Sequence, residues 1–403
     1  MDTSLGSLTP SERNELRVAG LSGEEVEAVS QSVCASVLLA VKSLVDEAND
    51  GLLAVNGAVR RESHGKHQGC LRAKFEVTSN SGVGIFRPGS SYAAWVRLSN
   101  GGAYQRDDRA EHISRGLAIK LLNVPDTATR THDFLLITSP RFFINDLTHY
   151  PSFLRSSSQG RPSQFFNFIF HMSAAERDVI QHRRSLKVSN LLEAPGYSAV
   201  PYRYVQDVVK YALAPSRLDA PPVMPQSHET PSNATEDYLE DAMNATLQAA
   251  GPDGVSLGFY VQRKQDRDSI EDPTHAWEGP FERVARITIP SGQHRGAPFD
   301  YSKNNTMAER LSFDPFNAAS DSSPVGKTNL TRQFVYKHLA AFRRREFPEL
   351  FARWKQDRND PGVPEEIRKE LKHLKHPDSV VLQTQDDREP EIDDGFRRLG
   401  IVA

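Results

Sequence analysis

Six short runs of strand-forming residues place the strongest constraint on how this chain folds. Each is rich in β-branched or aromatic residues or alternates apolar with polar ones, and Gly, Asn and Pro lie between neighbouring runs. Such runs with turn residues between them are typical of antiparallel pairing. The pattern therefore predicts an antiparallel sheet or barrel. The runs are "CLRAKFEVTS" (70–79), "SYAAWVRLSN" (91–100), "RGLAIKLLNV" (115–124), "DFLLITSPRFF" (133–143), "VSLGFYVQRK" (255–264) and "FERVARITIP" (281–290).

Helical periodicity appears outside these runs, so the predicted fold class is α+β. Residues 24–49 carry apolar positions at helical spacing and end at the turn signal "NDG", and "NLTRQFVYKHLAAFRR" (329–344) reads as a late helix. We expect residues 142–215 to be mainly helices and loops, and the proline- and serine-rich residues 220–237 to form an exposed connection. We divide the chain into an N-terminal helical segment (1–54), a central domain (55–350) and a charged C-terminal helix and tail (351–403).

Composition excludes several classes of protein. With 403 residues, 38% of them hydrophobic, and a formal charge of −3, the chain is typical of globular proteins and shows no sign of a nucleic-acid partner. The first twenty residues lack the apolar core of a secretory signal, and no run approaches a transmembrane span in length, so we expect a cytoplasmic protein. Cys34 and Cys70 are the only cysteines, which excludes a thiolate metal site and argues against a disulfide framework.

The late helix carries an unusual stripe of side chains. Arg332, Tyr336 and Arg343 are spaced by four and seven residues, so at about 100° per residue they lie within about 40° of one another. Taken alone, this stripe is equally typical of a tyrosine at the edge of the core with solvated arginines on either side.

Five motifs together resemble the haem catalase superfamily, in its shorter branch that also holds allene oxide synthases. They occur in the family's order over about residues 60 to 345: a histidine after an Arg-x-x step in "RRESHGKH", then "RLS", "RGLAIK", "PRFF" and "RQFVY". The resemblance implies an antiparallel β-barrel core surrounded by helices. It also implies haem b held between the barrel and the late helix, so that residues 55–350 form a catalase-like haem domain.

The resemblance gives the late helix its chemistry. Tyr336 becomes the ligand of the haem iron, and a tyrosine ligates ferric haem as its phenolate. Arg332, one turn earlier, supplies the positive charge that stabilises this anion, since a nearby cation commonly lowers a pKa by about 1–3 units. Arg343 matches the family's arginine that reaches a haem propionate.

The resemblance also assigns roles to residues on the distal side of the haem. His64 takes a proton from a bound peroxide and returns it to the leaving oxygen, and Ser99 orients its imidazole. Arg61 and Arg97 bind propionates, since an arginine fork holds a carboxylate, and Phe143 packs on the porphyrin. Plainer alternatives are a surface His-x-x-His pair for His64 and solvated arginines for Arg61 and Arg97. Phe142, Tyr150 and Phe153 continue the apolar wall or simply belong to the core.

Two positions depart from the family. Thr138 stands where the family has a distal asparagine, and a hydroxyl is a shorter, freely rotating donor. Losing such a donor can cost on the order of 10²–10³ in rate. Ser63 precedes the histidine where catalases carry an apolar residue, and its hydroxyl could reach the imidazole.

Three functions remain open at this stage. The first is a haem enzyme that activates the O–O bond of a peroxide or an organic hydroperoxide. The second is rearrangement of a fatty-acid hydroperoxide, for which "FFNFIF" (165–170) could line an apolar channel, or another haem oxidative step. The third is a haem-binding protein without catalysis. The sequence leaves open a homodimer or a larger homo-oligomer.

Overall fold

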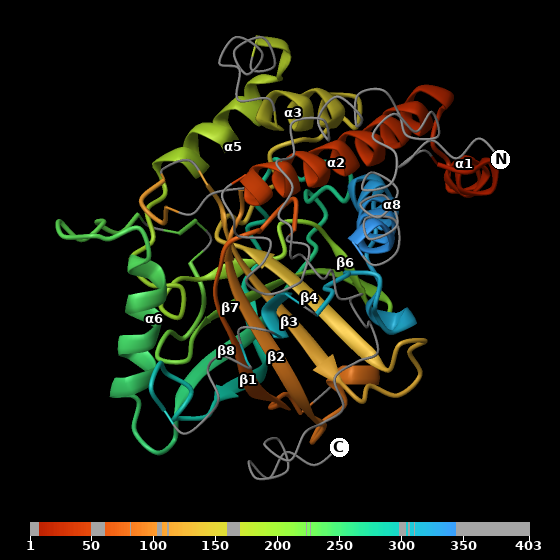
Figure 1. Cartoon of the computed structure of the whole chain (residues 1–403). Coiled ribbons are helices and arrows are strands. Elements are labelled where there is room, and N and C mark those ends of the chain that lie inside the picture. Colours follow the sequence, from red (N-terminus) through yellow and green to blue (C-terminus); the bar gives the residue numbers. More distant parts are fainter. Residues whose placement is uncertain are drawn as a thin grey trace.

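The computed structural model describes residues 8–49, 61–80, 82–102, 107–110, 113–158, 170–222, 224–225, 227–297, 304, 307–309 and 311–343. A nine-stranded antiparallel sheet forms its centre, in the order β5-β4-β3-β2-β1-β9-β8-β7-β6 (Figure 1). Pairing of β5 with β7 closes eight of these strands into a barrel, which removes the exposed edges of the sheet. The predicted α+β fold with a barrel core is confirmed.

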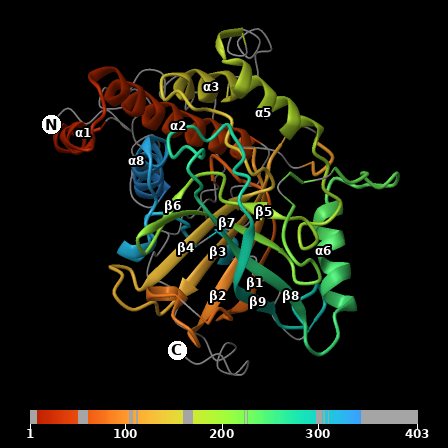
Figure 2. The same cartoon turned by 180° about the vertical axis from the view of Figure 1, so that it is seen from behind.

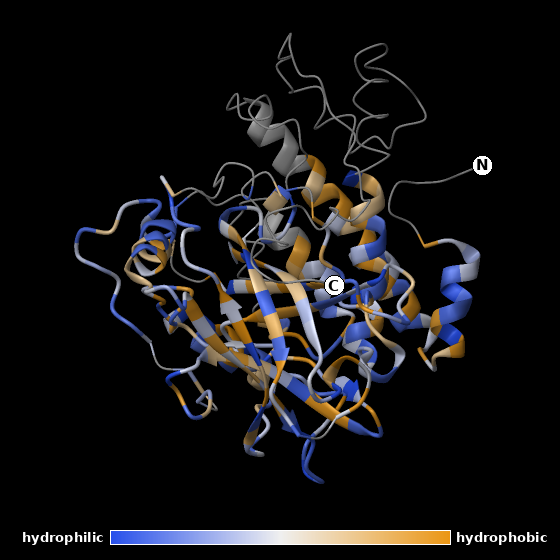
Figure 3. Cartoon of the chain, turned by 90° about the horizontal axis from the view of Figure 1, so that it is seen from below, coloured by the Kyte–Doolittle hydropathy of each residue, from blue (hydrophilic) through white to orange (hydrophobic). Residues whose placement is uncertain are grey.

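The strands follow the sequence pattern closely. Strands β2 (Ser91–Asn100), β3 (Arg115–Leu122), β8 (Val255–Arg263) and β9 (Phe281–Ile289) coincide with predicted runs. The remaining strands are β1 (His67–Val77), β4 (Thr131–Ile137), β5 (Gly196–Tyr197), β6 (Tyr202–Tyr204) and β7 (Asp207–Pro215). Figure 3 shows that both polar and apolar residues occur along the strands of the sheet.

Strand β7 was missed by the expectation that residues 142–215 are mainly helices and loops. Its residues are buried on both faces from Val209 onward, so its apolar positions lack clear alternation in the sequence. Lys210, which is almost fully buried, adds a charged residue to this otherwise apolar stretch.

Large aromatic side chains fill the inside of the barrel. Phe134 lies 4.7 Å from Phe259 and 5.0 Å from Tyr211, between ring centroids, and Phe75 lies 5.3 Å from Phe259. Burial of such rings contributes strongly to stability because each removes a large apolar area from water. The interior is therefore a packed core, so the site has to be sought outside it.

The helices gather outside the barrel, and α2 (Gly23–Asn49), α3 (His149–Ser158) and α5 (Ala174–Ser185) lie beyond one of its ends (Figures 1 and 2). Helix α8 (Lys327–Ala341) contacts α2, and α1 (Pro10–Val18) joins them in a second core. Glu12 of α1 forms an ion pair with Lys337 at 2.5 Å, and its carboxylate lies 3.2 Å from Nε2 of His338, which fixes α8. Helix α6 (Tyr238–Ala249) covers β1.

Two sequence predictions lie wholly or partly outside the described residues. The C-terminal segment 351–403 is one, and "FFNFIF" is the other, of which only Phe170 is described. The proposed division at residues 54 and 350 also falls there and stays a prediction.

Candidate functional site

His64 lies on the outer surface of the barrel. It precedes β1, and its Nδ1 lies 3.0 Å from Oγ of Ser99 on β2. Gly116 on β3 pairs with Ser99, and a Cβ at position 116 would overlap the imidazole ring. The backbone of His64 has φ +58°, in the left-handed region that few non-glycine residues adopt. Such strain is often found at functional sites, where the surrounding structure imposes it.

Two of the predicted arginines are next to this histidine. Arg97 donates from Nη2 to the carbonyl of His64 and from Nε to the carbonyl of Ala308, both at 3.0 Å. Arg61 donates from Nη2 to the carbonyls of Ala308, at 3.1 Å, and Leu311. The expectation that Arg97 and Ser99 share one strand face is confirmed, and neither is solvated.

The third predicted arginine joins the same cluster through Glu309. Arg343 donates to the Glu309 carbonyl at 3.0 Å, and the Glu309 carboxylate lies 3.7 Å from Arg97 and 3.5 Å from His67. Burial alone would raise the pKa of Glu309, but His67 and the arginines outweigh it and lower this pKa. A buried carboxylate thus shares the arginine cluster.

Electrostatics keep the imidazole neutral. Burial, followed by the positive charges of Arg97 and Arg61, lowers the pKa of His64 to about 3. The charges of Arg183 and Arg332 act in the same direction. Since Arg332 belongs to α8, the late helix and the loop that carries His64 are close enough to interact electrostatically.

On α8 the predicted pair is formed. The guanidinium carbon of Arg332 lies 5.6 Å from the ring centroid of the partly buried Tyr336. Arg332 is held by Asn329 at 2.9 Å and by the hydroxyl of Tyr202 at 3.5 Å. Burial opposes the charge of Arg332, but Tyr202 and Tyr336 outweigh burial and raise its pKa.

The aromatic residues of "PRFF" form a separate apolar cluster under α3 and α5. Phe143 is buried, with ring centroids 4.8 Å from Phe142 and 4.5 Å from Phe153. Tyr150 packs beside them, and burial, then the nearby Tyr336, raises its pKa to about 12. This cluster therefore lies near the tyrosine of α8.

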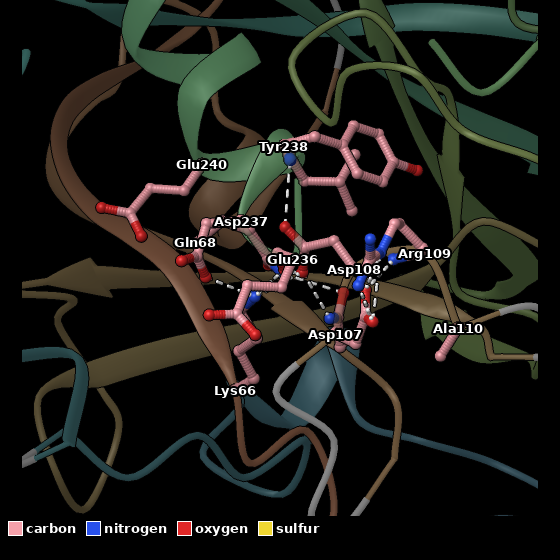
Figure 4. A network of polar contacts seen from close by, with 12 residues as sticks. Lys66, Gln68, Asp107, Asp108, Arg109, Ala110, Glu236, Asp237, Tyr238 and Glu240 are labelled. Carbon is pink, nitrogen blue, oxygen red and sulfur yellow. Dashed lines mark hydrogen bonds and ion pairs between the residues drawn. The ribbon is translucent and has the colours of Figure 1, made fainter. Parts of the chain in front are cut away.

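Thr138 belongs to a buried polar network that adjoins the His64 cluster, because Arg115 and Asn100 of this network are next to Gly116 and Ser99 in the sequence. Its Oγ1 accepts from the backbone N–H of Arg115 at 3.2 Å, which leaves the hydroxyl proton available as a donor. Arg115 donates to Asn100 at 2.6 Å, and Asn100 donates to Asp108 at 2.8 Å. Asp108 is fully buried, and its carboxylate forms an ion pair with Nζ of Lys66 at 2.9 Å. Both side chains are drawn in Figure 4.

This network holds the loop that carries His64. The backbone N–H of Asn100 donates to the Lys66 carbonyl at 2.9 Å, and the N–H of Gly65 donates to Gly102 at 3.2 Å. Ser63, expected to reach the imidazole, donates instead to the carbonyl of Gly101 at 3.3 Å. Its hydroxyl helps to fix the loop.

Sequence reasoning missed several residues of this arrangement. Gly116 lies inside a quoted motif, but only the register against Ser99 reveals that it seats the imidazole. Glu309 and Asn329 carry no motif signal. Arg183 lies in the charged run "QHRRS", which reads as a solvated helix face.

Solved structures of catalases align with most of this chain. A fungal catalase aligns with a TM-score of 0.57 and 17% identity, over 71% of this chain and 59% of its own. Catalase A from Saccharomyces cerevisiae gives 0.56 and 18%, over 71% and 61%, and a bacterial catalase gives 0.56 and 17%, over 71% and 58%. The fold is catalase-like. The chain spans about three-fifths of the length of these catalases.

No family model matches the chain, and no curated protein sequence matches it. Among the described helices of this catalase-like fold, none is both long and apolar enough to cross a membrane. Within the described residues, no group of three or more His, Cys, Asp or Glu side chains could hold a metal ion.

The residues present fit a haem group by their chemistry. Tyr336 offers a phenol beside a fixed cation, and three guanidiniums gather where two carboxylates could be neutralised. Nε of Arg61 is buried without a hydrogen-bond partner among the described residues, so the cluster keeps a donor for a further acceptor.

Proposed function

We propose that this chain is a haem-dependent enzyme that activates the O–O bond of a peroxide or an organic hydroperoxide. One observation supports this most: the Arg332–Tyr336 pair of α8 lies within electrostatic reach of the His64–Ser99 pair of the barrel. A ligating phenol opposite a neutral imidazole is the arrangement that such chemistry needs. Catalase-like neighbours of the fold agree with it.

Tyr336 would hold the iron as a phenolate. Arg332 keeps a permanent positive charge beside the ring, and Asn329 and Tyr202 fix the guanidinium in that position. A cation held in place stabilises the anionic form of its neighbour more than one free to move into water. The fixed guanidinium is therefore placed to pair with a phenolate formed on ligation.

Arg61, Arg97 and Arg343 would bind the two propionates. Together with the carboxylate of Glu309 they carry a net charge of about +2, taking each guanidinium as +1 and the carboxylate as −1. A ligand with two carboxylates would balance this charge. When bound, haem b supplies the iron at which an O–O bond is cleaved.

His64 would move the proton. With Ser99 accepting from Nδ1–H, the imidazole presents Nε2 as a base, and its low pKa keeps it neutral at physiological pH. The hydroxyl proton of Thr138 remains available to polarise a bound oxygen, more weakly than an amide would.

Replacing the ligand tests the proposal. Tyr336→Phe should abolish stable haem binding or remove the tyrosinate form from the ferric absorption spectrum. Tyr150→Phe is the matched control, since this partly buried phenol lies near Tyr336 and has no proposed contact with iron. An unchanged spectrum in Tyr336→Phe would refute the assignment of the ligand.

Two assays on the haem-loaded protein separate the functions. Oxygen release from hydrogen peroxide would identify catalase activity, and loss of diene absorbance would identify rearrangement of a fatty-acid hydroperoxide. Haem binding with neither reaction would identify a haem-binding protein without catalysis.

A further inference from the structure

The loop that carries His64 is held in a strained conformation. The φ of His64 is +58°, in the left-handed region that few non-glycine residues adopt. Two backbone hydrogen bonds follow it: the N–H of Gly65 donates to Gly102 at 3.2 Å, and the N–H of Asn100 donates to Lys66 at 2.9 Å. A strained backbone persists only while its surroundings impose it, so the side chains that hold this loop bear on the proposed base.

Asp108 is the carboxylate at the centre of these side chains. It is fully buried, and Nζ of Lys66, two residues after His64, pairs with its Oδ1 at 2.9 Å (Figure 4). The same oxygen accepts from the side-chain amides of Gln68 at 3.0 Å and Asn100 at 2.8 Å. One carboxylate thereby joins the His64 loop to β1 and β2.

The second oxygen of Asp108 joins the loop to helix α6. It accepts from the backbone N–H of Leu239, in the first turn of α6, at 3.0 Å, and the N–H of Asp108 donates to the Glu236 carbonyl at 2.8 Å. The helix dipole also favours a negative charge at this end of a helix. The loop is therefore held between the barrel and α6 by a single buried charge.

Asp237 offers a contrast within the same group of residues. It also pairs with Lys66, at 2.8 Å, but its side chain is 49% exposed, whereas that of Asp108 is fully buried. An exposed ion pair contributes little to stability, whereas loss of one partner of a buried pair is strongly destabilising. The two carboxylates share one partner and should differ in how firmly they hold the loop.

We propose that Asp108 is a positioning residue for His64: its carboxylate holds the loop so that the imidazole stays against the barrel and away from water. This inference rests on the proposed function, because it concerns the base of that site. It goes further by giving the placement of that base to a residue with no proposed contact with haem or peroxide.

Shielding from water is what a displaced loop would lose. Burial is the main cause that lowers the pKa of His64 from 6.5 to about 3, so outward movement of the loop should raise this pKa again. The cations that face the imidazole are Arg61, Arg97, Arg183 and Arg332. Glu62 lies on the loop itself, and burial raises its pKa. All of these groups are kept in the variants compared below.

Titration of His64 in the full chain without haem tests the proposal. Isotope-labelled histidine reports each imidazole by NMR, and His64→Gln identifies the signal of His64. In wild type this signal should stay unchanged from pH 8 to pH 5. In Asp108→Asn it should titrate with a midpoint between about pH 5 and pH 6.5. Loss of a negative charge would by itself lower the pKa of the imidazole, so a rise reports contact with water.

Three further variants separate this role from a general one. Asp237→Asn is the matched control, since it removes the same charge from the exposed partner of Lys66 and should leave the signal of His64 unchanged. Phe134→Ala controls for stability, because it opens the core inside the barrel and leaves the contacts of the loop in place. Lys66→Met removes the other half of the buried pair and should titrate in the same range as Asp108→Asn, which supplies the test if Asp108→Asn does not fold.

An unchanged His64 signal in folded Asp108→Asn, or in Lys66→Met where Asp108→Asn does not fold, would overturn the inference. An equal midpoint in Phe134→Ala would also overturn it, because loosening of the whole barrel would then be enough. An equal midpoint in Asp237→Asn would overturn it as well, because an exposed charge would then act like the buried one.

The two proposals fail separately. The titration uses no iron, so an effect of Asp108 on His64 would stand even if the ferric spectrum lacked the tyrosinate form. A haem-loaded protein with the tyrosinate spectrum, together with an unchanged His64 signal in Asp108→Asn, would keep the proposed function and remove this role of Asp108.

Discussion

The inner and outer faces of the same strands differ in what they contribute. On β2, Ala94, Val96 and Leu98 point into the aromatic core of the barrel. The residues that alternate with them include Arg97 and Ser99, which meet His64 and the segment that contains Ala308. Because side chains alternate along a strand, a single stretch of sequence supplies the core and the site at alternate positions.

The side chains of the two faces also find their partners in different parts of the chain. The inner face packs against other strands of the barrel, whereas charges of the outer face also take partners from segments outside the barrel. Lys120 pairs with Asp133 at 2.8 Å, and Asp133 accepts from the backbone N–H of Asp314 at 2.9 Å. The outer face is thus organised by segments that wrap the barrel, and its chemistry depends on them.

The largest effect is expected from the inner face. Phe134→Ala should lower the free energy of unfolding by about 3–5 kcal/mol, because it empties the centre of the aromatic core. Denaturation in urea measures the loss. Leu135→Ala, on the outer face and partly buried, should cost less. A smaller loss for Phe134→Ala than for Leu135→Ala would reverse the assignment of the two faces.

The same alternation explains what the sequence could predict. Turn residues flank β2, and the sequence predicts its bounds correctly. Strand β7 is buried on both faces, so its apolar residues have no period that distinguishes it from a helix. The pairings of Arg97 with Ser99 and of Arg332 with Tyr336 follow from strand and helix spacing.

The rest of the candidate site depends on contacts between distant segments. Glu309 reaches Arg97 across more than two hundred residues, and the stacking of Arg183 on Phe143 joins α5 to the loop after β4. No local pattern encodes such contacts. Tertiary packing decides them, which is why these two residues had no signal in the sequence.

At the outer face we expect a smaller effect on the free energy of unfolding and a large effect on the rate of reaction with peroxide. In Gly116→Ala the new Cβ would overlap the ring of His64, so the imidazole must shift. A displacement of about 1 Å can cost about 10²-fold in rate. Stopped-flow reaction of the haem-loaded protein with peroxide measures it.

Gly69→Ala provides the control for this substitution, because its Cβ would meet only the flexible end of Met243. It should leave the peroxide rate within about twofold of wild type, since it leaves the imidazole in place. Full reactivity in Gly116→Ala would show that His64 does not act from the position described.

The smallest effect compares one histidine from each face. Burial is the main cause that lowers the pKa of both His132 and His64 to about 3. The charge of Lys120 lowers that of His132 further, and the charges of the arginines lower that of His64 further. Since the ordinary pKa of histidine is 6.5, each contributes stability that is present above pH 6.5 and lost as the pH falls toward 3. His64→Gln and His132→Gln should each reduce the loss of unfolding free energy between pH 7.5 and pH 5.

Only the outer histidine should influence the rate. Because His64 stays neutral, the rate of peroxide reaction should be flat from pH 8 to pH 5 and fall only as the pH approaches 3. The arginines that face it keep their charge throughout this range. Burial raises the pKa of Asp314 to about 6, so this residue adds stability as the pH falls. Its contribution is the same in each variant and cancels when variants are compared at one pH. An inflection of the rate near pH 6.5 would mean that the imidazole is solvated, and that the outer face does not shield its base as the inner face shields His132.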